Sequence, residues 1–237
     1  MMSYNTEART YEQSGLNSYL VRVFTKMGLG LLVTALVAAV SYFSGFYYTF
    51  MNSLGNVGYL MLVVVEFGVV IGLSTRLMTM KTTTANLLFY IYAAITGFTF
   101  TSILYSFNVG VVGIAFAFTA VLFFSCAIIG HTTNRDLSQF STIFMGGLIA
   151  LILASVFAMF IPALANSLVL TYIGIILFMG LTAWDMQRVK QIYYGTNGEG
   201  QIGENLAVYG AFELYLDFID IFLSVLQIFG NSRNSRN

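Results

Sequence analysis

Acidic side chains lie inside stretches of sequence that are otherwise apolar enough to cross a membrane. They are Glu66, Asp185, Glu213, Asp217 and Asp220. An ionisable residue within a membrane span costs roughly 2.5–3.5 kcal/mol on insertion scales, and such residues mark ion and proton pathways. These acids are therefore the candidate functional residues of the chain.

Three of the acids share one face of a predicted helix. Glu213, Asp217 and Asp220 are spaced i, i+4 and i+7, which brings side chains onto one face of an α-helix. They cannot all face lipid at tolerable cost, so this face should turn toward the protein interior or a water-filled cavity. The run 206–229 contains no basic residue, so protons, a cation or a distant arginine must offset the charge.

The acidic cluster has three interpretations. Clustered carboxyl oxygens suit a hard cation such as Ca²⁺, in a binding site or a pathway. Adjacent carboxyl groups can also share a proton and act as a proton relay. The third interpretation is structural, with protonated carboxyls hydrogen-bonding between helices. Spacing alone leaves all three open.

The composition predicts a membrane protein. Of the 237 residues, 58% are apolar and 8% are charged, whereas a soluble domain carries about 25% charged residues. So few charges cannot cover a water-facing surface, and lipid should surround most of the chain. Ten basic and ten acidic residues cancel, which leaves no basic face for nucleic acid.

Seven runs meet or approach the length of about 20 apolar residues that a membrane span requires. The runs are 27–50, 57–75, 85–107, 109–130, 141–161, 167–186 and 206–229. We therefore expect an all-α transmembrane domain over 27–230, preceded by a cytoplasmic segment, 1–26, and followed by a disordered tail, 231–237. The polar stretch 187–205 is expected to be a mobile loop. Pro162 is expected to end the fifth span.

The basic residues predict an orientation. With the N-terminus in the cytoplasm, eight basic residues fall inside and only Arg233 and Arg236 fall outside, as the positive-inside rule requires. A six-span alternative would make the last run re-entrant and put the C-terminal tail inside. Arg76 follows Glu66 by ten residues. It is either a counter-charge for the acids at the cytoplasmic mouth or a marker of the membrane boundary.

The sequence does not contain the residues or motifs that several other functional classes require. The single histidine, His131, and the single cysteine, Cys126, do not make a hydrolase-type zinc site. All three lysines lie outside the predicted spans, which excludes a retinal Schiff base. No G-x-S-x-G, P-loop or EF-hand pattern occurs. We expect no enzyme activity and no bound cofactor, with His131 at the interface and Cys126 in packing.

Two segments carry a resemblance to a known family. The run 211–230 reads AFELYLDFIDIFLSVLQIFG, and the segment 180–190 reads GLTAWDMQRVK. The first resembles the C-terminal signature of the Bax inhibitor-1 family, the transmembrane Bax-inhibitor-motif proteins, and the second resembles the end of its sixth span. The pattern of spans matches over nearly the whole chain, and the short N-terminus is similar to that of bacterial members.

The resemblance implies a seven-helix fold in which the last helix is central and wrapped by the other six. It also implies a pH-sensitive Ca²⁺ leak in which Asp185 pairs with Asp217, both acting as weak ligands for the passing ion. By the same resemblance, Arg76 is the latch on this pair and Glu66 lies on the ion pathway. Asp220 stands where many members carry a neutral polar residue, so a simple two-aspartate titration is in doubt.

We therefore expect a calcium channel that acid closes at Asp185 and Asp217, with Glu66, Glu213 and Asp220 supplying oxygens along the route. Ca²⁺ would be the transported ion, and the partners would be the lipid bilayer, protons and, as in bacterial members, a membrane protease. For a bacterial protein the expected location is the inner membrane. The alternatives are a proton-coupled transporter of a small solute and a non-transporting modulator of membrane proteins such as a protease.

The predicted depths of the two aspartates differ. Asp217 lies 11 residues into the last run, whereas Asp185 lies at the end of the sixth. They can meet only if the last helix begins earlier than predicted, or if the sixth continues beyond Asp185.

Overall fold

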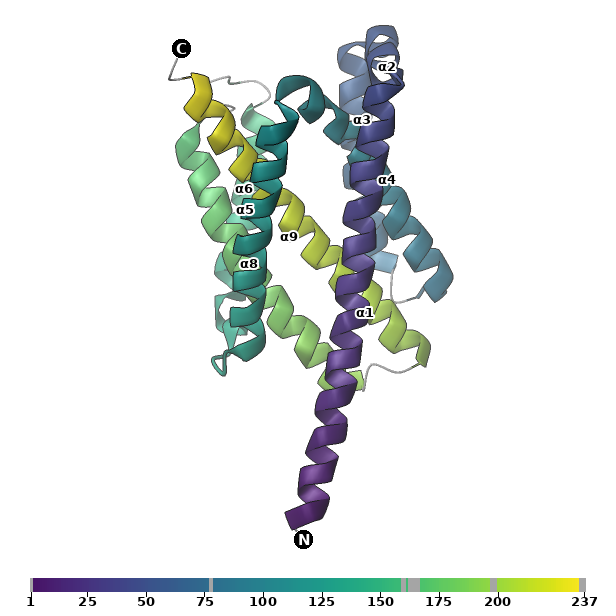
Figure 1. The fold of residues 1–237 in the computed structure, drawn as a ribbon, viewed down its shortest axis with the longest axis vertical. Coiled ribbons are helices and arrows are strands. Elements are labelled where there is room, and N and C mark those ends of the chain that lie inside the picture. Colours follow the sequence, from purple (N-terminus) through teal and green to yellow (C-terminus); the bar gives the residue numbers. More distant parts are fainter. Residues whose placement is uncertain (1, 77–78, 159–160, 162–166, 197–199, 235–237) are drawn as a thin grey trace. The chain divides into compact units, whose positions relative to one another are not determined.

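The chain is all-helical over the residues that the computed structural model describes (Figure 1). These residues are 2–76, 79–158, 161, 167–196 and 200–234, and they contain no strand. The prediction of an all-α protein is therefore confirmed.

Each predicted run overlaps a helix, and the first, 27–50, overlaps two. The α-helices are α1 (Met2–Phe43), α2 (Phe46–Leu54), α3 (Asn56–Arg76), α4 (Thr82–Ser106), α5 (Val109–Thr132), α6 (Ser141–Ala158), α8 (Leu168–Thr196) and α9 (Gly200–Asn234), with a short 3-10 helix η1 (Leu137–Phe140) before α6.

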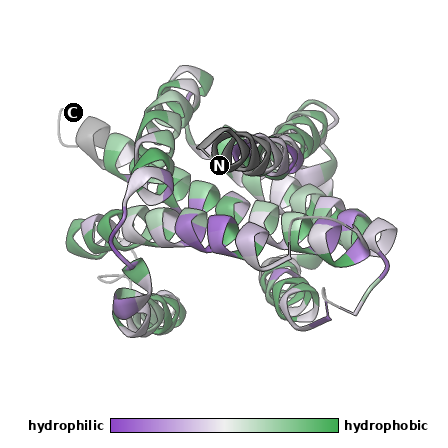
Figure 2. Ribbon diagram, turned by 90° about the horizontal axis from the view of Figure 1, so that it is seen from below, coloured by the Kyte–Doolittle hydropathy of each residue, from purple (hydrophilic) through white to green (hydrophobic). Residues whose placement is uncertain are grey.

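Five of the described segments are long and apolar enough to cross a membrane. They are Gln13–Phe43, Thr82–Ser106, Val109–Thr132, Leu137–Ala158 and Leu168–Thr196. Many large apolar side chains on them are exposed, and α6 buries none of its residues. Figure 2 shows hydrophobic residues over most of the ribbon. Lipid is the solvent that such surfaces require.

The first helix is longer at its start and shorter at its end than the first predicted run. α1 has 42 residues, so nearly all of the polar segment 1–26 is helical and continuous with the span. It ends at Phe43 because Gly45 adopts a φ of 68°. Glycine takes this left-handed conformation without the steric cost that other residues meet.

The prediction of a loop over 187–205 was wrong. α8 continues to Thr196 and α9 begins at Gly200, while 197–199 lie outside the described residues. Val189 and Ala207 are fully buried, so packing against protein stabilises helix here despite the polar composition. At the other end α9 continues to Asn234. Pro162 and residues 235–237 of the predicted tail lie outside the described residues.

The chain divides into two compact units. Unit 1 comprises Met1–Ser106 and Val189–Tyr215, and unit 2 comprises Phe107–Arg188 and Leu216–Asn237. Both α8 and α9 therefore contribute residues to each unit without a break in the helix.

In unit 1, α1 and α4 pack closely at a glycine. A Cβ atom added to Gly97 of α4 would lie 2.5 Å from the carbonyl oxygen of Thr34 and 3.0 Å from its Cα. Gly30 of α1 is similarly covered by the rings of Phe89 and Tyr215. Small residues let membrane helices approach in this way.

In unit 2, α9 packs on α5 through aromatic rings. Phe218 lies 5.2 Å from Phe116 and 5.5 Å from Phe123, measured between ring centroids. These contacts fix one side of the helix segment that carries Asp217.

Replacing Gly97 by alanine should destabilise the protein. The new methyl group meets backbone atoms that cannot turn aside, and overpacking of this kind costs about 1–3 kcal/mol. Gly113→Ala in α5 is the matched control, because nothing lies within 4 Å of its added Cβ. Thermal unfolding in detergent should show a lower midpoint for Gly97→Ala alone. Equal midpoints would contradict the close α1–α4 contact.

Candidate functional site

Asp185 and Asp217 are buried in the same unit. Their exposed fractions are 6% and 4%, and both belong to unit 2. Charged residues are almost never this buried unless other groups compensate them. Protein therefore surrounds both aspartates in the structure.

The two aspartates lie on the faces by which α8 and α9 contact each other. Asp185 follows Thr171 by 14 residues, four turns, which returns it to the same face of α8. Thr171 Oγ1 donates a hydrogen bond of 2.8 Å to Gln227 Oε1 on α9. On α9, Asp217 precedes Ser224 by seven residues, close to two turns, so it shares a face with Ser224, which contacts Gly174 of α8.

A second contact sets the register of the two helices. An added Cβ at Gly174 would lie 3.6 Å from Ser224 Oγ, so α8 and α9 run antiparallel. Asp185 is 11 residues from Gly174, and Asp217 is seven residues from Ser224. The two aspartates are therefore offset by four residues, one helical turn or about 6 Å along the axis.

The lengths of α8 and α9 resolve the difference in predicted depth. α8 extends 11 residues past Asp185, and α9 begins 17 residues before Asp217. Both conditions under which the two aspartates could meet are therefore fulfilled.

Asp220 shares the α9 face with Asp217 and belongs to unit 2. It is half-buried, and its backbone carbonyl accepts a hydrogen bond from Ser224 Oγ at 2.8 Å. Asp220 thus lies about one turn from Asp217 along α9.

The other predicted site residues belong to unit 1. Glu66 is half-buried on α3, and its Oε1 accepts a hydrogen bond of 2.9 Å from Thr99 Oγ1 on α4. Glu213 of α9 is half-buried, and Arg76 is exposed at the last position of α3. The latch between Arg76 and the aspartate pair stays a prediction, because Arg76 and the pair belong to different units.

Trp184 precedes Asp185 and lies beside two other side chains of unit 2. Its ring centroid is 6.0 Å from that of Phe144 on α6, and the Arg188 guanidinium lies 5.7 Å above the ring. His131 is half-buried one residue before the end of α5, and Cys126 is buried in α5.

Sequence reasoning missed an ion-pair cluster in unit 1. Glu204 of α9 lies 3.2 Å from Arg22 Nε and 3.6 Å from Lys26 Nζ on α1. Lys26 also donates a hydrogen bond of 2.9 Å to Asn86 Oδ1 on α4. The spacing of Arg22 and Lys26, i and i+4, was a usable signal, but their partner lay in a predicted loop.

Two buried polar residues of α9 were also missed. Asn205, 1% exposed, donates to the Met80 carbonyl at 2.8 Å and accepts from Thr82 Oγ1 at 2.7 Å. Tyr215 is fully buried, and its hydroxyl lies 2.7 Å from Thr34 Oγ1, which also donates to the Ala93 carbonyl at 3.0 Å. These bonds join α9 to α1 and α4.

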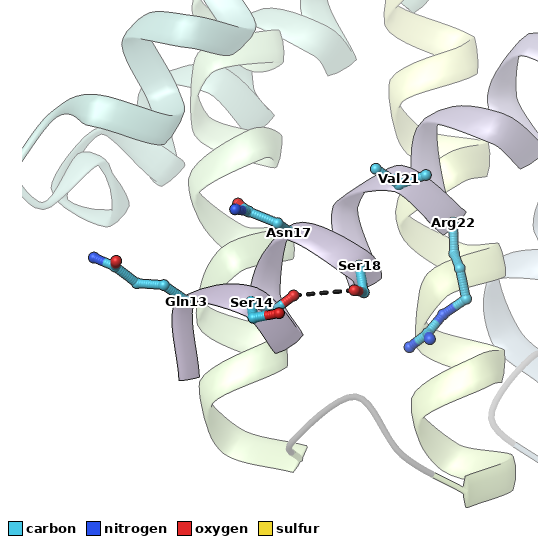
Figure 3. A pocket seen from close by; sticks show the side chains of 6 residues that line it. All are labelled: Gln13, Ser14, Asn17, Ser18, Val21 and Arg22. Atoms are coloured by element: carbon cyan, nitrogen blue, oxygen red, sulfur yellow. Dashed lines mark hydrogen bonds between the residues drawn. The ribbon is translucent and has the colours of Figure 1, made fainter. Parts of the chain in front are cut away.

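An open hollow of about 640 Å³ lies along the first part of α1 (Figure 3). Its lining residues are Gln13, Ser14, Asn17, Ser18, Val21 and Arg22. None of the predicted site residues is among them, so this hollow is not the candidate site. Within the described part of the chain, no three His, Cys, Asp or Glu side chains gather as a metal site.

Apolar helices of membrane-spanning length, with buried carboxyls on two of them, define an integral multi-pass α-helical membrane protein. A family model described as inhibitor of apoptosis-promoting Bax1 matches residues 16–234. The chain belongs to this family, the Bax inhibitor-1 family, and the resemblance inferred from its sequence is confirmed.

Curated relatives match over nearly their full lengths. The inner membrane protein YbhL of Escherichia coli K12 is 36% identical over 226 residues, which cover 93% of this chain and 94% of YbhL. An uncharacterized protein of Rickettsia prowazekii is 30% identical over 235 residues, or 98% of this chain and 97% of the relative. An uncharacterized membrane protein of Streptococcus pyogenes serotype M3 is 34% identical over 226 residues, or 94% and 97%.

Tyr215→Phe should remove one buried hydrogen bond between α9 and α1. Thr34 keeps its bond to the Ala93 carbonyl, so the loss should be about 1 kcal/mol of unfolding free energy. Tyr48→Phe is the control, because Tyr48 is 63% exposed. Unfolding in detergent should show a lower stability for Tyr215→Phe alone, and an unchanged value would show that the contact adds nothing.

Proposed function

We propose that this chain is a passive Ca²⁺ leak channel that protons close at Asp185 and Asp217. The observation that carries the proposal is that both carboxyls are buried in one unit, on α8 and α9, two helices that contact each other at Thr171 and Gln227. The proposed gating depends on how the protonation of the two carboxyl groups changes with pH.

Two carboxyl groups in one buried site cannot both ionise without mutual repulsion. In acid the pair shares a proton, attraction replaces repulsion, and α8 and α9 stay together. At higher pH both groups ionise, and repulsion favours an arrangement in which the helices separate. The apparent titration belongs to the coupled pair, and Asp220 on the same face joins it.

The remaining acids supply oxygens along the route. Glu66 and Glu213 lie in unit 1, and Glu66 is oriented by Thr99. Ca²⁺ prefers six to eight oxygen ligands, so a pair of carboxyls holds it weakly without water or carbonyls. Weak binding suits conduction, which requires that the ion also leave. Arg76 acts as the latch on the closed pair.

The proposed topology has seven spans, an N-terminus in the cytoplasm and α9 at the centre. The burial of α9 supports a central position, because among residues 203–226 only Leu223 is exposed. α9 also carries four acids, Glu204 included, and surrounding helices would shield them from lipid. The inner-membrane relative in Escherichia coli supports the same location for this chain.

Neutralising the pair should abolish the pH response. In liposomes, Ca²⁺ flux of the wild type should rise with pH. The flux of Asp185→Asn combined with Asp217→Asn should stay at its acid level, because amides cannot repel. A difference of about tenfold at alkaline pH corresponds to about 1.4 kcal/mol of opening free energy.

Asp136→Asn is the matched control, because Asp136 is exposed and an asparagine can still cap η1. It should keep the wild-type profile. A double variant with wild-type flux at every pH would refute the gate. Proton uptake that depends on an added solute would identify a transporter instead.

Single-cysteine labelling tests the topology. In a Cys126→Ala background, cysteines at Ser53 and Ser235 should react with an impermeant reagent from outside, and a cysteine at Ser138 only from inside. Labelling of position 235 from inside would establish six spans, and labelling of position 53 from inside would reverse the orientation.

A further inference from the structure

Gln187 is a buried side chain that bonds to the loop between α5 and η1. Its exposed fraction is 6%. Its Oε1 accepts a hydrogen bond of 2.8 Å from the Leu137 amide, and its Nε2 donates one of 2.8 Å to the Arg135 carbonyl. One amide group thus satisfies a backbone donor and a backbone acceptor that lie two residues apart, so both ends of the side chain are fixed.

The end of α5 contacts α8 one turn before Gln187. A Cβ atom added to Gly130 would overlap the backbone carbonyl of Ala183, so the two backbones are in direct contact there. Ala183 and Gln187 are spaced i and i+4 and lie on one face of α8. The end of α5 and the loop that follows it therefore hold this face at two points.

Asp185 lies between these two points in sequence and on the opposite side of the helix. Two residues correspond to about 200° of rotation around an α-helix. The face of α8 with Ala183 and Gln187 is thus bonded to the α5–η1 region, while the face with Asp185 is turned toward α9. A movement of this segment that separates Asp185 from Asp217 must either strain the contacts of Ala183 and Gln187 or move the α5–η1 loop with the helix.

We infer that Gln187 is a positioning residue that holds Asp185 in the closed arrangement and thereby sets the pH at which the gate opens. The inference rests on the proposed gate. In the proposed gate the arrangement with both aspartates buried is the closed one, and the contacts at Gln187 are intact in it. Their loss lowers the cost of opening, and the gate then opens at a lower pH.

The test compares Gln187→Leu with Gln191→Leu. Leucine is close in size to glutamine but makes neither hydrogen bond, and Gln191 is exposed one turn further along α8. Loss of the bonds changes the opening equilibrium by roughly tenfold, which for one titrating proton moves the midpoint of Ca²⁺ flux by about one pH unit. We expect this shift toward acid for Gln187→Leu and the wild-type midpoint for Gln191→Leu.

Gln187→Glu is a second variant, which tests the inference if the leucine variant does not fold. A carboxylate still accepts from the Leu137 amide but cannot donate to the Arg135 carbonyl. Its midpoint should also shift toward acid, because the buried carboxylate repels the Arg135 carbonyl that it faces. An unchanged midpoint, a shift toward alkali, or an equal shift in Gln191→Leu overturns the inference.

Hydrogen exchange separates this inference from the proposed function. The Leu137 amide should exchange faster in Gln187→Leu than in the wild type, and at the wild-type rate in Gln191→Leu. Flux that is independent of pH in the wild type would refute the gate, whatever the exchange shows. Faster exchange with an unmoved flux midpoint refutes the role of Gln187 and leaves the gate standing.

Discussion

A carboxyl group inside an apolar bundle must be shielded from lipid by the protein itself. Hydrocarbon offers neither hydrogen bonds nor counter-charges, so the cost falls only when other helices surround the group. Asp185 and Asp217 meet this requirement through burial, and Glu66 meets it in part through Thr99. The positions of α8 and α9 follow from the same requirement, because their acidic faces must turn away from lipid.

The acids themselves could be predicted from the sequence, since a charge in an apolar run is conspicuous. α9 is helical from Glu213 to Asp220, so the i, i+4, i+7 spacing puts Glu213, Asp217 and Asp220 on one face of a real helix. The extent of the helices could not be predicted, because rules for lipid-facing spans assign polar stretches to loops. Val189 and Ala207 are buried against protein, and there a helix forms without the apolar composition that lipid would demand.

Hydrogen bonds between residues that are distant in sequence could not be predicted, for a different reason. Gln187 bonds to residues 50 and 52 positions earlier, and Asn205 to residues 123 and 125 positions earlier. Neither side-chain amide carries a charge or belongs to a motif, so the neighbouring sequence does not indicate that the residue is buried and bonded. Both are buried and fix a turn between two other helices. Such residues become visible only once the helices are assembled.

The single tryptophan gives the chain a built-in optical reporter. Trp184 is covalently adjacent to Asp185 and lies against Phe144 and Arg188. The 15 tyrosines are silent when the protein is excited at the red edge of its absorption band, so the emitted light comes from one known place. A displacement of α8 would change the polarity and quenching around this indole, and unlabelled protein in a bilayer could be followed in real time.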